Sequence, residues 1–164
     1  MTVKTRTDPK LDRIMKFLTL EGEITVGVHA VDGAAAHDSG PSIIEIAEQH
    51  EFGLGVPQRS FLRAWFDENR DEIEKRIVSE FQRAMTEGQT HDWAATRLAL
   101  WLQASIQRRI RNRIAPPLHP RTIAQKTRSG SPGPKDVPLI DTGVLKSAIL
   151  AYWKGKAVQP VGRA

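Results

Sequence analysis

The chain contains no cysteine, and this absence removes several kinds of chemistry. Without a thiol there is no disulfide, no thiolate metal ligand and no cysteine nucleophile, which fits a cytosolic origin. Long apolar runs are absent as well, since no stretch reaches the roughly 18 apolar residues of a membrane-spanning helix. The N-terminus, M-T-V-K-T-R-T-D-P, lacks the apolar core of a secretory signal. We therefore expect no membrane partner.

Motifs of catalytic and cofactor sites are also missing. The five histidines share no metal-ligand spacing such as H-x-x-x-H. No serine stands in a nucleophile elbow. No G-K-S/T follows Gly27, Gly33 or Gly40, as a phosphate-binding loop would require. We therefore predict no catalytic residue, no cofactor and no metal, and a protein that is not an enzyme.

Charge is distributed unevenly along the chain. Residues 1–82 carry 10 basic and 15 acidic side chains, a net charge of −5. Residues 83–164 carry 14 basic and 4 acidic side chains, a net charge of +10. Such polarity suits self-association, in which the acidic part of one subunit faces the basic part of the next, or a surface that faces nucleic acid.

Length and hydrophobic periodicity predict one α+β domain over residues 1–164, with two long helices packed against a small, mainly antiparallel sheet. The first long helix is expected at about 60–86, with an apolar stripe that runs from Phe61 to Met85. The second is expected at about 92–114, capped by Asp92 and stopped by Pro116-Pro117. Apolar residues spaced by four predict its buried face: Leu98, Leu102, Ile106, Ile110 and Ile114.

Shorter elements complete the predicted fold. A capped helix is expected from Asp8, a strand at 24–28 and a mobile loop at 31–41. Ser42 and Glu45 form a predicted capping box for a helix that stops near Gly53. Residues 149–153 are expected to close the sheet as an edge strand. The basic segment from Leu118 to Val137 is poor in apolar residues, so we expect it to be flexible, poorly ordered or extended, until a neighbour packs on it.

The stretch from Val137 to Leu150, V-P-L-I-D-T-G-V-L-K-S-A-I-L, admits two interpretations. An apolar pair before Asp-Thr-Gly is typical of an aspartic protease half-site, in which Asp141 would share a proton with a second carboxylate. Such a protease needs a β-rich domain around the motif, with most of its substrate cleft after the motif, and only 21 residues follow Gly143. The favoured interpretation is a tight turn, in which Asp141 or Thr142 caps a short following helix.

Three separated segments follow one another in a characteristic order. They read I-A-E-Q-H-E-F-G at 46–53, V-P-Q-R-S-F-L-R at 56–63, and H-P-R-T-I-A-Q-K at 119–126, which leads to P-L-I-D-T-G-V-L-K-S-A-I at 138–149. In this order the chain resembles the tail-completion or neck proteins of tailed bacteriophages, including the Mu-like virion morphogenesis proteins. The resemblance covers about residues 43–149. Family members usually carry a small residue and a proline where this chain has Gln58 and Ser60.

The resemblance implies a structural virion protein that completes the tail or joins it to the head. It implies a ring of subunits, six copies being the leading expectation, around a channel through which genomic DNA passes. Its neighbours would be phage head-connector and tail proteins, and assembly would take place in the host bacterial cytoplasm.

Each matching segment also has a predicted structural role. Phe52 is expected to be buried while Gly53 adopts a left-handed conformation. Pro57 and Arg59 are expected to fix the entry to the long helix, with Phe61 as its anchor. Leu145 and Ile149 are expected to continue the buried face of the 138–140 segment. The full set of motif residues is Glu51, Phe52, Gly53, Pro57, Arg59, Phe61, Leu62, Pro138, Leu139, Ile140, Asp141, Thr142, Gly143, Leu145 and Ile149.

An arginine run near the end of the second long helix has two interpretations. Arg108, Arg109, Arg111 and Arg113 could form an ordinary solvated face, or a face that meets a neighbouring subunit or DNA. The alternative function is therefore an independent basic nucleic-acid-binding protein, which the isoelectric point near 9.8 permits. Against it, no recognition-helix or zinc-finger pattern is present.

Overall fold

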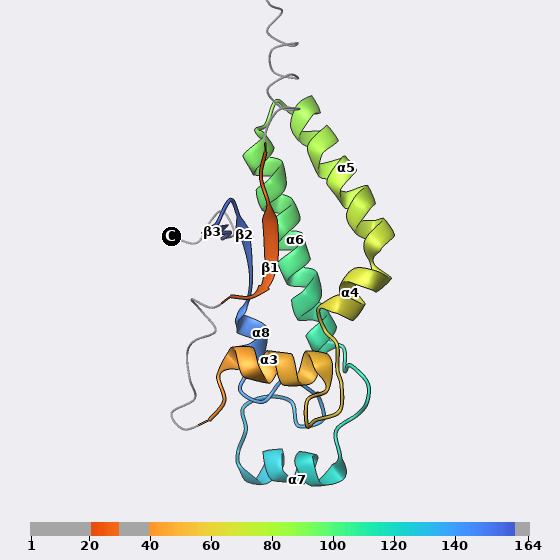
Figure 1. The fold of residues 1–164 in the computed structure, drawn as a ribbon, viewed down its shortest axis with the longest axis vertical. Helices are drawn as coiled ribbons and strands as arrows, with labels where there is room; N and C mark the ends of the chain where they lie inside the picture. The colour runs from red at the N-terminus through yellow and green to blue at the C-terminus, as the bar shows by residue number, and fades with distance from the viewer. Residues whose placement is uncertain (1–20, 30–39, 160–164) are drawn as a thin grey trace, which may run out of the picture.

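Helix α6 (His91–Arg111) is the central element of the fold. The computed structural model describes residues 21–29 and 40–159. Within them α6 lies between the small sheet and helix α5 (Arg70–Thr86) (Figure 1). The cap of α6 is Thr90, whose Oγ1 accepts a hydrogen bond from the Trp93 N–H at 3.1 Å. The predicted cap at Asp92 is therefore wrong. The predicted α+β architecture is confirmed.

The sheet contains β1 (Ile24–Val28), β2 (Ile149–Trp153) and β3 (Lys156–Ala157), in that order. β2 is antiparallel to both neighbours. It is the middle strand of the sheet, which corrects the prediction of an edge strand. Lys154 and Gly155 both have positive φ, 50° and 72°, which suits the tight turn between β2 and β3. This turn provides the third strand, which the sequence analysis did not predict.

Four further helices lie in the lower part of the molecule, and the one at the bottom, α7, lies below α3 (Figure 1). They are α3 (Ile43–Phe52), α4 (Arg63–Glu68), α7 (Pro120–Arg128) and α8 (Val144–Ser147). The predicted Ser42–Glu45 capping box opens α3: the Glu45 N–H donates to Ser42 Oγ, and the Ser42 N–H donates to the Glu45 carboxylate. The helix predicted from Asp8, and most of the loop predicted at 31–41, lie outside the described residues.

The predicted helix at 60–86 is two helices, broken at Asn69. The Asn69 side chain donates to the Trp65 carbonyl at 2.7 Å, and its backbone N–H donates to the same oxygen at 3.1 Å. An asparagine amide that bonds its own helix in this way competes with helical continuation. The apolar stripe is also not buried throughout, because the side chains of Ile77 and Met85 are each 40% exposed.

Helix α7 lies within the segment 118–137, which the sequence predicts to be poorly ordered or extended. Pro120 occupies the first turn, where its missing N–H costs nothing, and His119 Nδ1 accepts from the Arg121 N–H at 3.2 Å. The buried ammonium of Lys126 then donates to three backbone carbonyls, those of Pro134, Val137 and Ile140. These hydrogen bonds hold the segment in place, although it contains few apolar residues.

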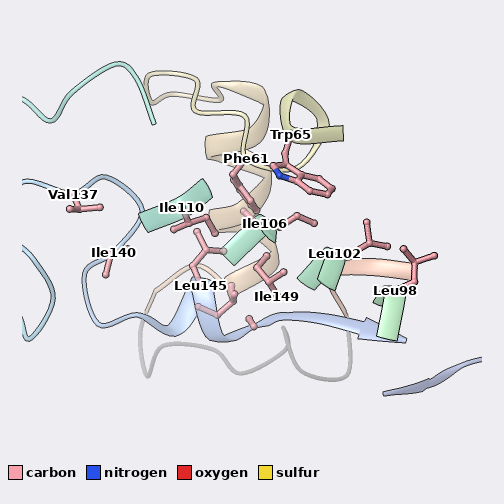
Figure 2. Packing of buried hydrophobic residues seen from close by; sticks show 13 residues of the cluster. Phe61, Trp65, Leu98, Leu102, Ile106, Ile110, Val137, Ile140, Leu145 and Ile149 are labelled. Atoms are coloured by element: carbon pink, nitrogen blue, oxygen red, sulfur yellow. The ribbon is translucent and has the colours of Figure 1, made fainter. Parts of the chain in front are cut away.

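The core follows the buried face of α6 (Figure 2). The spacing of four places Leu98, Leu102, Ile106 and Ile110 in the core as predicted, and Ile114 is partly buried against it. Side chains from the entry to α4 and from the chain around α8 cover this face from either side. These are Phe61, Trp65, Leu145 and Ile149, all buried.

Replacing Phe61 with alanine should therefore destabilise the protein. Phe61 is 0% exposed, and truncating a buried phenylalanine costs about 3–5 kcal/mol of unfolding free energy. Urea unfolding measures the loss. Phe66→Ala is the control, since Phe66 is 36% exposed and its truncation should cost clearly less. Equal losses in the two variants would show that Phe61 does not anchor the core.

Candidate functional site

Hydrogen-bond donors at the entry to α4 converge on one buried carboxylate, that of Glu51 of α3, which is 5% exposed. Its Oε2 accepts the N–H groups of Phe61 at 2.9 Å and Leu62 at 3.0 Å. Its Oε1 accepts the Arg63 N–H at 3.0 Å and the Ser60 hydroxyl at 2.6 Å. Glu51 therefore caps the first turn of α4 from a different helix.

The same contacts set the charge state of Glu51. Burial alone would raise its pKa, but the hydrogen bonds from Ser60 and from the three backbone N–H groups outweigh burial and hold the pKa below the ordinary value of 4.5. Arg63 Nε lies 3.2 Å from Oε1 and adds an opposite charge. The carboxylate is therefore ionised at neutral pH and satisfied by donors on both oxygens.

Arg59 connects this entry to the chain beyond α6. Its side chain is buried, and its guanidinium donates to the carbonyls of Pro116 at 2.8 Å and Pro117 at 3.2 Å. A third donation reaches the Pro57 carbonyl at 3.4 Å. The planar guanidinium suits this fork, which an ammonium group would not reproduce. Arg59 therefore holds the entry to α4 against the loop that leads to α7, a wider role than the predicted one.

The Asp-Thr-Gly turn lies at the end of a loop closed by Asp141. The Asp141 carbonyl accepts from the Gly133 N–H at 2.8 Å and from the Ser131 hydroxyl at 2.9 Å. The Ser131 hydroxyl also contacts the Asp141 carboxylate. Gly133 is required here, since a Cβ would lie 2.3 Å from the Asp141 carbonyl oxygen. Asp141 therefore takes part in loop closure.

Neither Asp141 nor Thr142 caps α8, which corrects that prediction. The N-cap is Gly143, with φ of 89° and no side-chain hydrogen bond to the helix. Helix α8 is nevertheless present at the predicted place, and its Leu145 is buried as expected. Gly143 adopts the left-handed backbone conformation that favours glycine, and this conformation turns the chain into α8.

The remaining motif residues divide into confirmed and corrected predictions. Gly53 has φ of 74°, as predicted for the end of α3. Phe52 is not buried: its side chain is 52% exposed and lies against the Arg63 guanidinium, 4.4 Å from the ring centroid. Pro138 and Ile140 are buried, whereas Leu139 is partly buried with φ of 62°.

The arginine run is divided by its ion pairs. Arg109 bonds the Glu68 carboxylate, with Nη2 2.9 Å from Oε1, and Arg113 Nη2 lies 2.6 Å from Asp136 Oδ2. Both are therefore engaged within the subunit. Arg108 and Arg111 are exposed and have no ion pair with another described residue.

Next to the Asp-Thr-Gly turn lies an apolar groove of about 360 Å³, here called the α3–α7 groove. Its walls include Ile46 and His50 of α3, Gln125 of α7, and Leu139 and Val144 of the turn region. His50 Nδ1 is buried without a hydrogen-bond partner in the described part of the chain. Burial, together with the charge of Arg59, lowers the His50 pKa, which favours the neutral ring.

Within residues 21–29 and 40–159, no group of three or more His, Asp or Glu side chains could hold a metal ion. No helix in this part of the chain is long and apolar enough to cross a membrane. No known protein family, no curated protein and no solved structure matches the chain. The resemblance to phage tail-completion proteins therefore stays a prediction from the sequence motifs.

Replacing Glu51 with glutamine should lower the unfolding free energy at pH 7 by about 1–3 kcal/mol, because the amide turns one acceptor into a donor that faces other donors. The Glu51 pKa is lowered in the folded state. Its carboxylate therefore stabilises the fold fully above the unfolded-state pKa, and this contribution is lost as the pH falls through the folded-state pKa. Wild type and variant should converge in acid.

Urea unfolding at pH 7, and at the lowest pH at which the fold persists, measures both effects. Glu48→Gln is the matched control, because Glu48 lies on the same helix and is exposed. A loss as small in Glu51→Gln as in the control at pH 7 would contradict the capping role.

Proposed function

We propose that the protein is a structural component of the particle of a tailed phage or prophage. It completes the tail or joins it to the head, as a ring of subunits around the DNA channel. The subunit contributes shape and contact surfaces, and no catalytic residue. Six copies are the leading expectation for the ring.

The observation that carries the proposal is the ordered set of sequence segments together with the place where they meet. Residues 46–53 and 56–63 are far in the chain from residues 119–126 and 138–149, but all four segments lie in the lower part of the molecule (Figure 1). Glu51 joins the first two segments, and Lys126 joins the last two. Motif residues that form a common framework favour a shared fold over a shared reaction.

Surface properties add support for assembly. From Gln107 to Ser147 the chain has nine lysines and arginines and two carboxylates, whereas Asp67–Glu74 has five carboxylates and one arginine. Opposite charges gathered on different parts of one subunit favour contacts between copies. Seven large apolar side chains among the described residues are exposed by 36% or more, and exposed apolar residues that gather in patches mark interaction surfaces.

An independent nucleic-acid-binding protein is the second candidate. It is favoured by Arg108 and Arg111, which are exposed and have no ion pair with another described residue. If this function holds, the purified protein binds bare duplex DNA, and the affinity falls steeply as salt rises. Arg108→Glu combined with Arg111→Glu would then abolish that binding.

A map of the upper end of the tail in intact particles tests the main proposal. We expect a ring of this subunit, six-fold in the leading case, with the DNA channel at its centre. Particles should lose joined tails when the gene is inactivated and regain them with the wild-type copy. A single asymmetric copy per particle, or a particle without the protein, would refute the proposal.

A further inference from the structure

Helix α5 carries apolar side chains that the described residues leave exposed. Ile77 and Met85 are eight residues apart, and Val78 lies seven residues before Met85, so all three share one side of the helix. Phe81 lies on the same side but is partly buried, because it packs against the core and contacts the His91 ring. Val78 is 54% exposed, and Ile77 and Met85 are each 40% exposed. Within the described part of the chain α5 packs mainly on α6, and this side extends beyond that contact.

The N-terminal end of the same side is acidic. Glu74 lies one turn before Val78, and Asp71 lies seven residues before it, so both share the side of Val78. Both are exposed, and neither forms an ion pair with another described residue. We call this combined surface the α5 face. A partner for it must bring an apolar recess bordered by positive charge.

The α3–α7 groove has that complementary character. The groove is a hollow in the surface, whereas the α5 face is a row of exposed side chains on a helix. Val144, which lines the groove, is 40% exposed. Arg121 and Arg128 are seven residues apart on α7 and lie on the same side as Gln125, which lines the groove. Both arginines are exposed and have no ion pair with another described residue.

We infer that the α5 face of one subunit docks into the α3–α7 groove of a second copy of this chain. The inference rests on the proposed ring and specifies its contact. Two different surfaces meet, so each copy can bind one neighbour on each side, and such a head-to-tail contact closes into a ring if the rotation between copies allows it. α5 and α7 lie toward opposite ends of the subunit (Figure 1), so one copy can use both surfaces at once.

Cross-linking tests the contact directly, because the chain contains no cysteine. Val78→Cys and Val144→Cys are conservative changes at exposed positions. Mixed and treated with a flexible bis-maleimide, which tolerates a longer separation than a disulfide, the two proteins should form a 78–144 dimer. Its yield should exceed by several-fold that from mixing Ser79→Cys with Ala157→Cys, two exposed control positions.

The products of the mixture separate the alternatives. A 78–78 product in excess would indicate a symmetric α5–α5 contact and would overturn the inference. A 78–144 yield no greater than the control would also overturn it. If residues of the same chain cover the α5 face, Val78→Arg will lower the melting temperature of the monomer more than Ser79→Arg does, and the inference fails.

Charge reversal gives an independent measure. Arg121→Glu combined with Arg128→Glu should reduce the 78–144 yield several-fold, and Asp71→Lys combined with Glu74→Lys in the other protein should restore much of it. A yield that does not respond to these changes would contradict the role of charge in the contact.

A single chain with both Val78→Cys and Val144→Cys then separates this inference from the proposed function. A ladder of cross-linked products that stops at one size indicates a closed ring and supports both. A ladder without a limit supports the contact but contradicts the ring. A particle that contains the ring but gives no 78–144 product upholds the function and refutes the contact.

Discussion

A buried carboxylate, that of Glu51, fixes the point where the chain leaves α3 and enters α4, and much of the lower half of the molecule depends on it. Its oxygens accept three consecutive backbone N–H groups and one hydroxyl, which determines the direction of α4 and places Phe61 against α6. Arg59, two residues before Phe61, then holds the loop after α6. That loop leads to α7, whose Lys126 orders the chain before β2. Charged groups thus position the apolar ones.

The parts of the fold that follow from repeated spacing could be predicted from the sequence. Leu98 to Ile110 recur every fourth residue, and a helix with that pattern has one possible buried face. The capping box at Ser42 is a local signal and was confirmed, as was Gly53, where a helix end needs a left-handed residue. The α+β class follows from these elements together. In the candidate site, the spacing correctly placed Phe61 and Leu145 in the core.

What could not be predicted depends on contacts between distant residues. Glutamate and lysine are usually exposed, so nothing in the sequence marks Glu51 or Lys126 as buried; only the donors and carbonyls brought by other segments make burial favourable. The break at Asn69 depends on one side-chain hydrogen bond. The hairpin at Lys154-Gly155 lacks the usual Asn-Gly or Asp-Gly signal, so β2 was predicted to be an edge strand. The extent of the α5 face required knowing which side of α5 meets α6.

The pKa of Glu51, followed by NMR at the side-chain carboxyl carbon, tests the central claim most directly. If the carboxylate organises the entry to α4, its pKa lies below the ordinary value of 4.5, because donors on both oxygens outweigh the effect of burial. The amide signals of Phe61, Leu62 and Arg63 should shift over the same pH range, since their N–H groups bond this carboxylate. A pKa at or above 4.5, with those amides unaffected, is what burial without the hydrogen bonds would produce, and it would contradict the account.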